Sequence, residues 1–257
     1  MYSPSFVAFA LTISSLLHYA ECAKVYLAGD STMAPTGSGA ATAGWGPYLA
    51  QFLTLPVVNN AVSGRSARSY TEEGRFTSLI NAVGPGDYVV IEFGHNDGPS
   101  AVDNGRQDGY SDGYNDTNVV YDASGKAITI HSFNYYIKNA VRSLQSKGAI
   151  PIVSSQTPNN YWVKNTIIPP PHFVPWAAEV AGNTSVTYVD HYHYVAQAYE
   201  VLGQSTVKVF YPNDPVHTSP TGAKVVAQAF VRGVMCSNST LKAYVNHAGQ
   251  SVPNGCL

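Results

Sequence analysis

Short hydrophobic runs alternate along the chain with longer amphipathic segments. The run YVVIEF at Tyr88–Phe93 is continuous, which is typical of a strand covered on both faces. The other segments with strand character are Val25–Ala28, Val57–Asn60, Ile150–Ser154 and Thr187–Val189. Strands that alternate with helices form βαβ units, and these favour a parallel sheet with helices on both faces. The pattern therefore predicts an α/β fold, a three-layer αβα sandwich around a five-stranded parallel sheet.

The segments between and after these strands have helical spacing. They are Trp45–Leu53, Tyr70–Val83, Phe133–Lys147, Val174–Ala181, His191–Leu202 and a last helix that starts at Ser219-Pro220 and runs to about Cys236. Gly148 and Gly203 follow two of them, where a helix commonly ends on glycine. Ser219 is suited to cap the last helix and Pro220 to open it. No composition shift or internal repeat divides residues 23–257, so we expect a single domain.

Two long segments, Gly94–Thr129 and Gln156–His172, are rich in Gly, Asp, Asn or Pro and are predicted to be loops. Loops of this length in a compact domain are usually functional or disordered. Both follow the carboxyl ends of predicted strands, where ligands bind in open α/β sheets.

Residues 1–22 read as a secretory signal peptide. The apolar run Phe6–Leu17 is too short to span a bilayer, and the small residues Ala20 and Cys22 fit a cleavage site after Cys22. An N-terminal anchor helix is the alternative. No other long apolar segment exists in the sequence, so we expect a secreted, extracellular protein without a membrane partner.

Cysteines and glycosylation motifs agree with secretion. Removal of Cys22 leaves Cys236 and Cys256, which we expect to form a disulfide that holds the C-terminal tail. Sequons for N-glycosylation occur at Asn115, Asn183 and Asn238.

Composition narrows the choice of partners. Charged residues make up only 12% of the chain, about half the usual share, whereas tyrosine occurs 18 times. The formal net charge is −2, which gives no reason to expect binding to nucleic acid or to an anionic membrane. Such a polar, weakly charged surface suits secreted proteins that handle sugars. We expect a monomer.

Four short polar segments stand at element boundaries: Gly29-Asp30-Ser31, Asn60–Arg65, Gly94–Asp97 and Asp214–His217. The first three follow predicted strands, and in a parallel sheet they meet at one edge. The fourth lies just before the last helix, on a loop that can fold over them. The sequence therefore predicts one site built from all four.

These residue types fit acyl transfer. Ser31 is a nucleophile that needs a base, His217 can take its proton, and Asp214 can fix the imidazole tautomer. The oxyanion of the tetrahedral intermediate needs hydrogen-bond donors. We expect these donors to be the backbone N–H groups of Ser31 and Gly64 and the side-chain amide of Asn96. This chemistry requires neither a metal nor a cofactor.

The same segments, in their longer contexts, resemble the SGNH or GDSL-type hydrolases, and among them the fungal rhamnogalacturonan acetylesterases. The stretches that carry the resemblance are VYLAGDSTMA (25–34), GWGPYLAQFL (44–53), VVNNAVSGRSARSYTEEGRF (57–76), GDYVVIEFGHNDG (86–98), SSQTPNN (154–160) and HTSPTGAKVVAQAF (217–230).

The resemblance implies a flavodoxin-like fold and the removal of O-acetyl groups from acetylated rhamnogalacturonan, a pectic polysaccharide, through an acetyl-enzyme. It assigns catalysis to Ser31, Asp214 and His217, and the oxyanion hole to Ser31, Gly64 and Asn96. Two departures stand out. Family members have a second disulfide in the loop after the Asn block, but residues 104–118 contain no cysteine, and Pro215 is inserted between Asp214 and His217.

Other interpretations remain open. An SGNH esterase could act on another acetylated polysaccharide or on a small ester. A metal-dependent deacetylase would use Asp190-His191-Tyr192-His193, and an α/β-hydrolase would need a nucleophile elbow, which Gly64–Arg68 approaches but does not complete. A carbohydrate-binding protein without activity would use tyrosines to stack on sugars.

Rhamnogalacturonan carries carboxylates, so we expect an arginine in the substrate site. Arg65, next to Gly64, is the preferred contact, since a guanidinium pairs bidentately with a carboxylate. If a helix begins near Ser66, Arg68 and Arg75 would share one face. Internal ion pairs of these arginines with Glu72 or Glu73 are the alternative.

Overall fold

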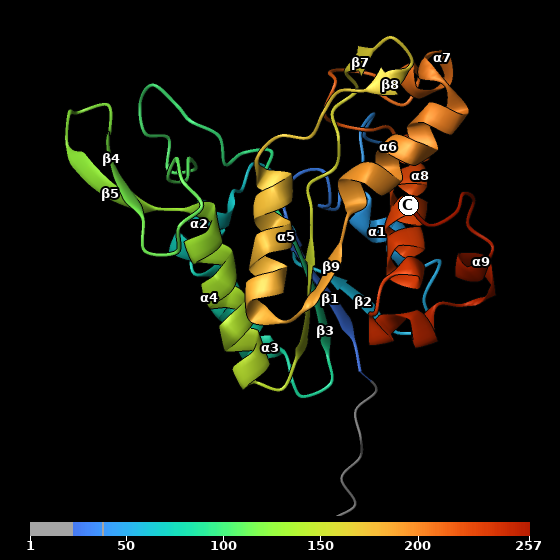
Figure 1. Cartoon of the computed structure of the whole chain (residues 1–257), viewed down its shortest axis with the longest axis horizontal. Helices are drawn as coiled ribbons and strands as arrows, with labels where there is room; N and C mark the ends of the chain where they lie inside the picture. Colours follow the sequence, from blue (N-terminus) through green and yellow to red (C-terminus); the bar gives the residue numbers. More distant parts are fainter. Residues whose placement is uncertain (1–22, 38) are drawn as a thin grey trace, which may run out of the picture.

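The computed structural model describes residues 23–37 and 39–257, and its centre is a parallel five-stranded sheet (Figure 1). The strands are β1 (Val25–Gly29), β2 (Val57–Asn59), β3 (Tyr88–Glu92), β6 (Ile150–Ser154) and β9 (Thr187–Val189), in the order β2-β1-β3-β6-β9. All five predicted strands are present, and the α/β fold with its parallel sheet is confirmed.

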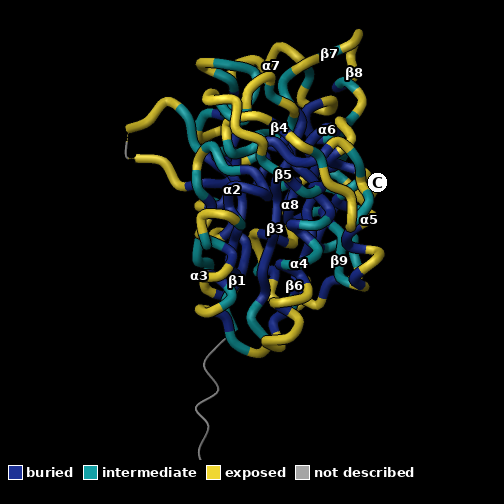
Figure 2. Tube along the Cα trace, turned by 90° about the vertical axis from the view of Figure 1, so that its left-hand side faces the viewer, coloured by how far each residue is buried: buried dark blue, intermediate teal, exposed yellow. Residues whose placement is uncertain are grey.

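Successive side chains of each strand point to opposite faces of the sheet, and helices pack against both faces. Val25 and Leu27 of β1 pack with α1 (Gly46–Leu49), α6 (His191–Leu202) and α8 (Pro220–Cys236). Tyr26 and Ala28 belong to the opposite core, which α2 (Ala67–Glu72), α3 (Arg75–Ala82), α4 (Phe133–Ser146) and α5 (Phe173–Thr184) complete. Figure 2 shows the buried sheet between these layers.

Two predicted helices differ in the structure. The helix expected at Trp45–Leu53 is only α1, because the chain beyond it turns to pair Leu53 with Val245 near the C-terminus. The helix expected at Tyr70–Val83 is two helices, α2 and α3, separated by Gly74 at φ 72°. Arg68 and Arg75 therefore lie on different helices, and the expectation that they share one face is wrong.

The two long loops contain structure that the hydrophobic pattern did not predict. One carries the hairpin β4 (Thr117–Tyr121) and β5 (Ala127–His131), and the other the hairpin β7 (Trp162–Val163) and β8 (Thr166–Ile167). Asp122 stabilises the first hairpin turn by accepting the backbone N–H groups of Ser124 and Lys126. Both hairpins lie at the carboxyl end of the sheet, the upper end in Figure 1.

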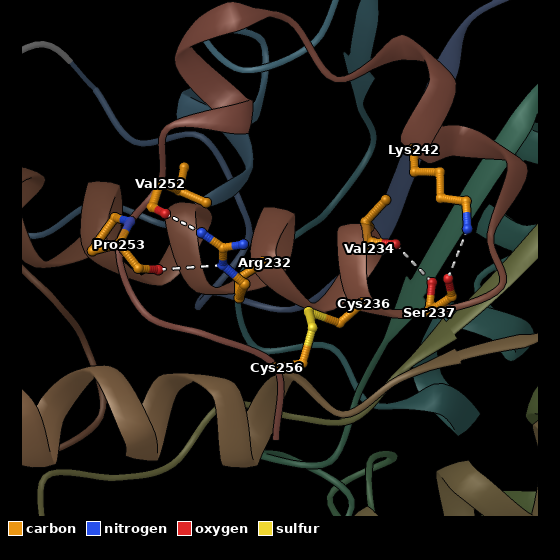
Figure 3. The surroundings of a disulfide bond; sticks show 8 residues. All are labelled: Arg232, Val234, Cys236, Ser237, Lys242, Val252, Pro253 and Cys256. Atoms are coloured by element: carbon orange, nitrogen blue, oxygen red, sulfur yellow. Dashed lines mark hydrogen bonds between the residues drawn. A yellow bond between two sulfur atoms is a disulfide. The ribbon is translucent and has the colours of Figure 1, made fainter.

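The C-terminal tail packs back onto α8. It contains α9 (His247–Gln250) after the 3₁₀ helix η1 (Thr240–Tyr244), and a further short helix, α7 (Gln204–Lys208), precedes α8. Cys236 and Cys256 form the expected disulfide, with their Cα atoms 5.6 Å apart. Arg232 of α8 donates to the carbonyl oxygens of Val252 and Pro253 beside it (Figure 3).

Several sequence predictions concern the outer surface and the N-terminus. Asn115, Asn183 and Asn238 are all exposed. The predicted signal peptide, residues 1–22, lies outside the described residues. Within residues 23–37 and 39–257, no helix combines the length and the apolar character that a membrane span requires.

Candidate active site

Ser31 lies in a tight turn that ends β1. A Cβ on Gly29 would stand 2.8 Å from Sδ of Met33 and 2.9 Å from the carbonyl oxygen of Glu92, so only glycine fits there. The buried Asp30 carboxylate accepts from both the backbone N–H and the hydroxyl of Thr32, each at 2.8 Å. Asp30 thus fixes the turn, and Ser31 remains accessible at its outer side.

Ser31, His217 and Asp214 form one hydrogen-bonded chain, as the sequence predicts. Ser31 Oγ lies 2.9 Å from His217 Nε2, and His217 Nδ1 lies 2.9 Å from Asp214 Oδ2. The carboxylate can only accept, so Nδ1 carries a proton and Nε2 is free to accept from the serine hydroxyl. This is the geometry of a serine nucleophile with its base and orienting acid.

The loop that carries Asp214 and His217 is held from several sides. Asp214 Oδ1 accepts the backbone N–H groups of Val216 at 2.7 Å and His217 at 2.8 Å. Although partial burial opposes the shift, these bonds and the His217 ring hold the pKa of Asp214 below its ordinary value. The carbonyl of Pro215 accepts from the backbone of Asn160, so the inserted proline supports the loop.

The predicted oxyanion donors lie beside this chain. Val62 donates its backbone N–H to the carbonyl of Gly29, which places the loop after β2 against the Ser31 turn. Within the described residues, neither Ser31 nor Gly64 donates its backbone N–H to another group. The Asn96 amide donates one hydrogen to the carbonyl of Arg65 at 3.1 Å and keeps its second. The segment that carries Gly64 is thus hydrogen-bonded both to the end of β1, next to Ser31, and to Asn96.

An open pocket of about 240 Å³ gives access to Ser31. Its lining residues are Ser31, Thr36, Thr42, Ala43, Ser63, Asn213, Asp214 and His217. The lining is small and polar, and Ser63 connects this pocket to Gly64. A pocket lined mainly by short side chains suits a short acyl group better than a long acyl chain.

The three arginines after Gly64 all form ion pairs. Arg65 Nε lies 3.1 and 3.0 Å from the two carboxylate oxygens of Glu73, which also pairs with Arg75. Arg68 pairs with Glu72 and with Asp103. For Arg65, the structure therefore supports the internal ion pair over the predicted substrate contact.

The pair between Arg68 and Asp103 is buried, with side-chain exposures of 3% and 4%. We expect Arg68→Ala to lower the free energy of unfolding by about 3–5 kcal/mol, because Asp103 would remain buried without its partner. Arg75→Ala is the matched control, since Arg75 and Glu73 are 35% and 37% exposed and such pairs contribute about 1 kcal/mol or less. Urea unfolding of both variants measures the difference. Similar losses for both would contradict the structural role of Arg68.

Sequence reasoning missed a buried acid pair next to Asn96. Asp97 and Asp108 are buried next to each other, and the backbone N–H of Asp108 donates to the carbonyl of Asp97 at 2.9 Å. Asp97 Oδ2 and both carboxyl oxygens of Asp108 have no hydrogen-bond partner among the described residues. Burial raises the pKa of Asp97 to about 7 and that of Asp108 well above its ordinary value. The charge of Asp30 raises the pKa of Asp97 further, whereas Arg68 opposes the shift of Asp108.

This pair predicts a loss of stability as the pH rises from about 4 through 7. A carboxyl with a raised native pKa contributes stability that is complete below about pH 4 and is lost as the pH rises through the native value near 7. Asp108→Asn replaces one of the two carboxyl groups with an amide that stays neutral at every pH. Between pH 5 and 8.5, we expect the free energy of unfolding of the variant to rise by about 1–3 kcal/mol relative to that of the natural protein. Urea unfolding midpoints of both proteins at pH 5 and 8.5 test this prediction. Equal changes in midpoint for the two proteins would contradict it.

The residues of the alternative sites have other roles. His191 is fully buried, with Nδ1 2.7 Å from Glu92 and Nε2 2.9 Å from the carbonyl of Val226. His193 pairs with Asp190 on the surface. Among the described residues, no three metal-binding side chains cluster. Ser66, the serine of the incomplete elbow, is buried and accepts the backbone N–H of Ser69 as the cap of α2.

Comparisons with known proteins show the family to which the chain belongs. Residues 25–230 match the family "GDSL-like Lipase/Acylhydrolase". A rhamnogalacturonan acetylesterase from Emericella nidulans is 48% identical over 234 residues, covering 90% of this chain and 93% of that protein.

Among solved structures, the YXIM protein of Bacillus subtilis has a TM-score of 0.69 at 19% identity, covering 83% of this chain and 56% of the other. An acetylxylan esterase from Geobacillus stearothermophilus has a TM-score of 0.51 at 16% identity, covering 82% of this chain and 94% of the other. At these identities, the two structures support the fold alone.

Proposed function

Because the chain belongs to the GDSL-like lipase/acylhydrolase family, we propose that it is an esterase that removes O-acetyl groups from acetylated rhamnogalacturonan. The observation that carries the proposal is the hydrogen-bonded chain Ser31–His217–Asp214 at an open polar pocket. The similarity to the Emericella nidulans rhamnogalacturonan acetylesterase supports the substrate.

Acylation begins at Ser31. His217 Nε2 takes the proton of the Ser31 hydroxyl as its Oγ attacks the acetyl carbonyl. The backbone N–H groups of Ser31 and Gly64 and the amide of Asn96 donate to the oxyanion, and one such donor is typically worth about 10²–10³ in turnover. His217 then gives its proton to the departing sugar hydroxyl, which leaves Ser31 acetylated.

Deacylation repeats these steps with water. His217 takes a proton from a water molecule that attacks the acetyl-enzyme, and acetate leaves as Ser31 regains its proton. Asp214 keeps the imidazole in the required tautomer throughout. In both halves the imidazole must be neutral to accept a proton, so activity should fall toward acidic pH.

Acetate release from a panel of polymers tests the substrate. The natural enzyme should release acetate from acetylated rhamnogalacturonan with a higher kcat/KM than from acetylated xylan or acetylated homogalacturonan. 4-Nitrophenyl acetate serves as a small neutral ester in the same assay. Faster release from acetylated xylan would overturn the proposed substrate while leaving the esterase activity in place.

The same proposal includes secretion. The enzyme acts outside the cell as a monomer after removal of residues 1–22, with glycans on the exposed Asn115, Asn183 and Asn238. N-terminal sequencing of the natural protein should begin at Ala23. Enzymatic removal of N-linked glycans should lower its apparent mass, and an intact N-terminus with no change in mass would contradict secretion.

A further inference from the structure

A second hollow, of about 450 Å³, lies beside Gly64, the proposed oxyanion donor. It is lined by Gly64, Arg65, Ser69, Glu72, Glu73, Asn104, Gly105 and Arg106. It shares no lining residue with the pocket at Ser31, although Ser63 and Gly64 are adjacent in the chain. The two hollows therefore flank the segment that carries Gly64.

Arg106 is the one arginine here that has no carboxylate partner among the described residues. Arg65, Arg68 and Arg75 pair with the three carboxylates of Glu72, Glu73 and Asp103. With Arg106 included, four guanidinium groups face three carboxylates, which leaves one positive charge. That charge lies at the wall of the hollow.

A rigid turn presents Arg106. Asp103 is bound bidentately by the buried Arg68, with distances of 2.8 and 3.1 Å. Asp103 also accepts the backbone N–H of Gly105, and Asn104 accepts that of Arg106. Gly105 has a φ of 75°, which fits a tight turn. These hydrogen bonds thus connect the backbone at Arg106 to the buried Arg68–Asp103 pair.

The Arg106 guanidinium lies next to the proposed oxyanion donors. Its Nη1 is 3.5 Å from Asn96 Oδ1 and 3.9 Å from the point where a Cβ on Gly64 would lie. A guanidinium has five N–H donors in a planar fork, and this one long contact leaves the others free. An anion held there would stand close to an acetyl group under attack by Ser31.

We propose that Arg106 binds a galacturonate carboxylate of the substrate and so selects acetylated sugars that lie on an acidic glycan. The proposal rests on the function proposed above. It replaces Arg65, whose guanidinium is occupied by Glu73, as the residue that recognises the carboxylate.

The test combines a protein variant with a change in the substrate. The natural enzyme and Arg106→Gln are compared on acetylated rhamnogalacturonan with free uronates and on the same polymer with methyl-esterified uronates, by release of acetate. We expect Arg106→Gln to lower kcat/KM about 10–100-fold on the free-acid polymer, mostly through KM, since a hydrogen bond to a charged group is lost. On the methyl-esterified polymer, Arg106→Gln should lower kcat/KM much less.

Two further variants sharpen the comparison. Arg106→Lys keeps the charge without the planar fork and should recover part of the loss. Lys147→Gln removes one positive charge from an exposed residue beside the start of β6, at the other end of the sheet, and should behave like the natural enzyme on both polymers. Added salt should raise KM of the natural enzyme for the free-acid polymer more than that of Arg106→Gln.

The outcomes separate this inference from the function on which it rests. Equal losses on the two polymers would mean that Arg106 acts only through Asn96 or the fold, and would overturn carboxylate recognition. An unchanged KM for the free-acid polymer would overturn it as well. If the natural enzyme hydrolysed 4-nitrophenyl acetate but released no acetate from either polymer, the proposed substrate would be wrong, and the inference would fall with it.

Discussion

Replacement of Ser31 by alanine is expected to abolish ester hydrolysis, with a loss in kcat of about 10⁴–10⁶, and to leave the fold intact. Ser31 Oγ bonds only to His217 Nε2 among the described groups, and it is partly exposed at a turn whose geometry depends on Gly29 and Asp30. Its removal therefore takes away the nucleophile without disturbing the core. Turnover of 4-nitrophenyl acetate and acetylated rhamnogalacturonan measures the loss, and circular dichroism checks the fold.

Ser66→Ala is the control for Ser31→Ala. Ser66 belongs to the incomplete nucleophile elbow but is buried and caps α2, so its loss should cost about 1 kcal/mol of stability and no catalytic group. A serine-directed organophosphate should label the natural enzyme and Ser66→Ala with one equivalent, and Ser31→Ala with none. Near-normal turnover by Ser31→Ala would contradict the proposed mechanism. A natural protein that resisted labelling would instead favour a carbohydrate-binding protein without activity.

Much of this site was predictable because it depends on local rules. The continuous apolar run at Tyr88–Phe93 fixes a central strand, and parallel strands bring their carboxyl ends to one edge. Ser31, Gly64 and Asn96 each follow such a strand, so their meeting follows from topology. The motifs also predicted the family correctly, and cysteine parity predicted the bridge between Cys236 and Cys256.

The remaining features depend on partners that are distant in sequence. Arg68 meets Asp103 across 35 positions, and His191 meets Glu92 across 99, so no local pattern indicates that either is buried. The same holds for Arg106, which the turn at Asp103 brings to Asn96 and Gly64. The hairpin β4–β5 is different. The residues on either side of Asp122–Gly125 have a pattern that is typical of a β-hairpin. The Gly- and Asn-rich segments around them favoured the prediction of a loop instead.

Replacement of Asp214 by asparagine is expected to lower kcat by about 10⁴ while the protein stays folded. The asparagine oxygen can still accept the backbone N–H groups of Val216 and His217, as Asp214 Oδ1 does. Its NH₂ group, however, would face His217 Nδ1 and donate to it. The proton of the neutral imidazole would then sit on Nε2, which could no longer accept from Ser31. The loss should appear in kcat on both a small ester and the polymer, because the proton transfer is common to them.

Asp190→Asn supplies a control of the same spacing and chemistry. Asp190 pairs with His193 Nδ1 at 2.8 Å, three residues along, and caps α6 through the backbone N–H of His193, but this pair lies apart from the Ser31 pocket. Asparagine caps helices as well as aspartate does, so this variant should retain both fold and kcat. Asp214 is also held ionised by its lowered pKa, so protonation of Asp214 should not limit the natural enzyme's activity on the acid side of the pH–rate profile. A kcat for Asp214→Asn within about tenfold of that for Asp190→Asn would show that the imidazole tautomer does not depend on Asp214 and would remove it from the catalytic chain.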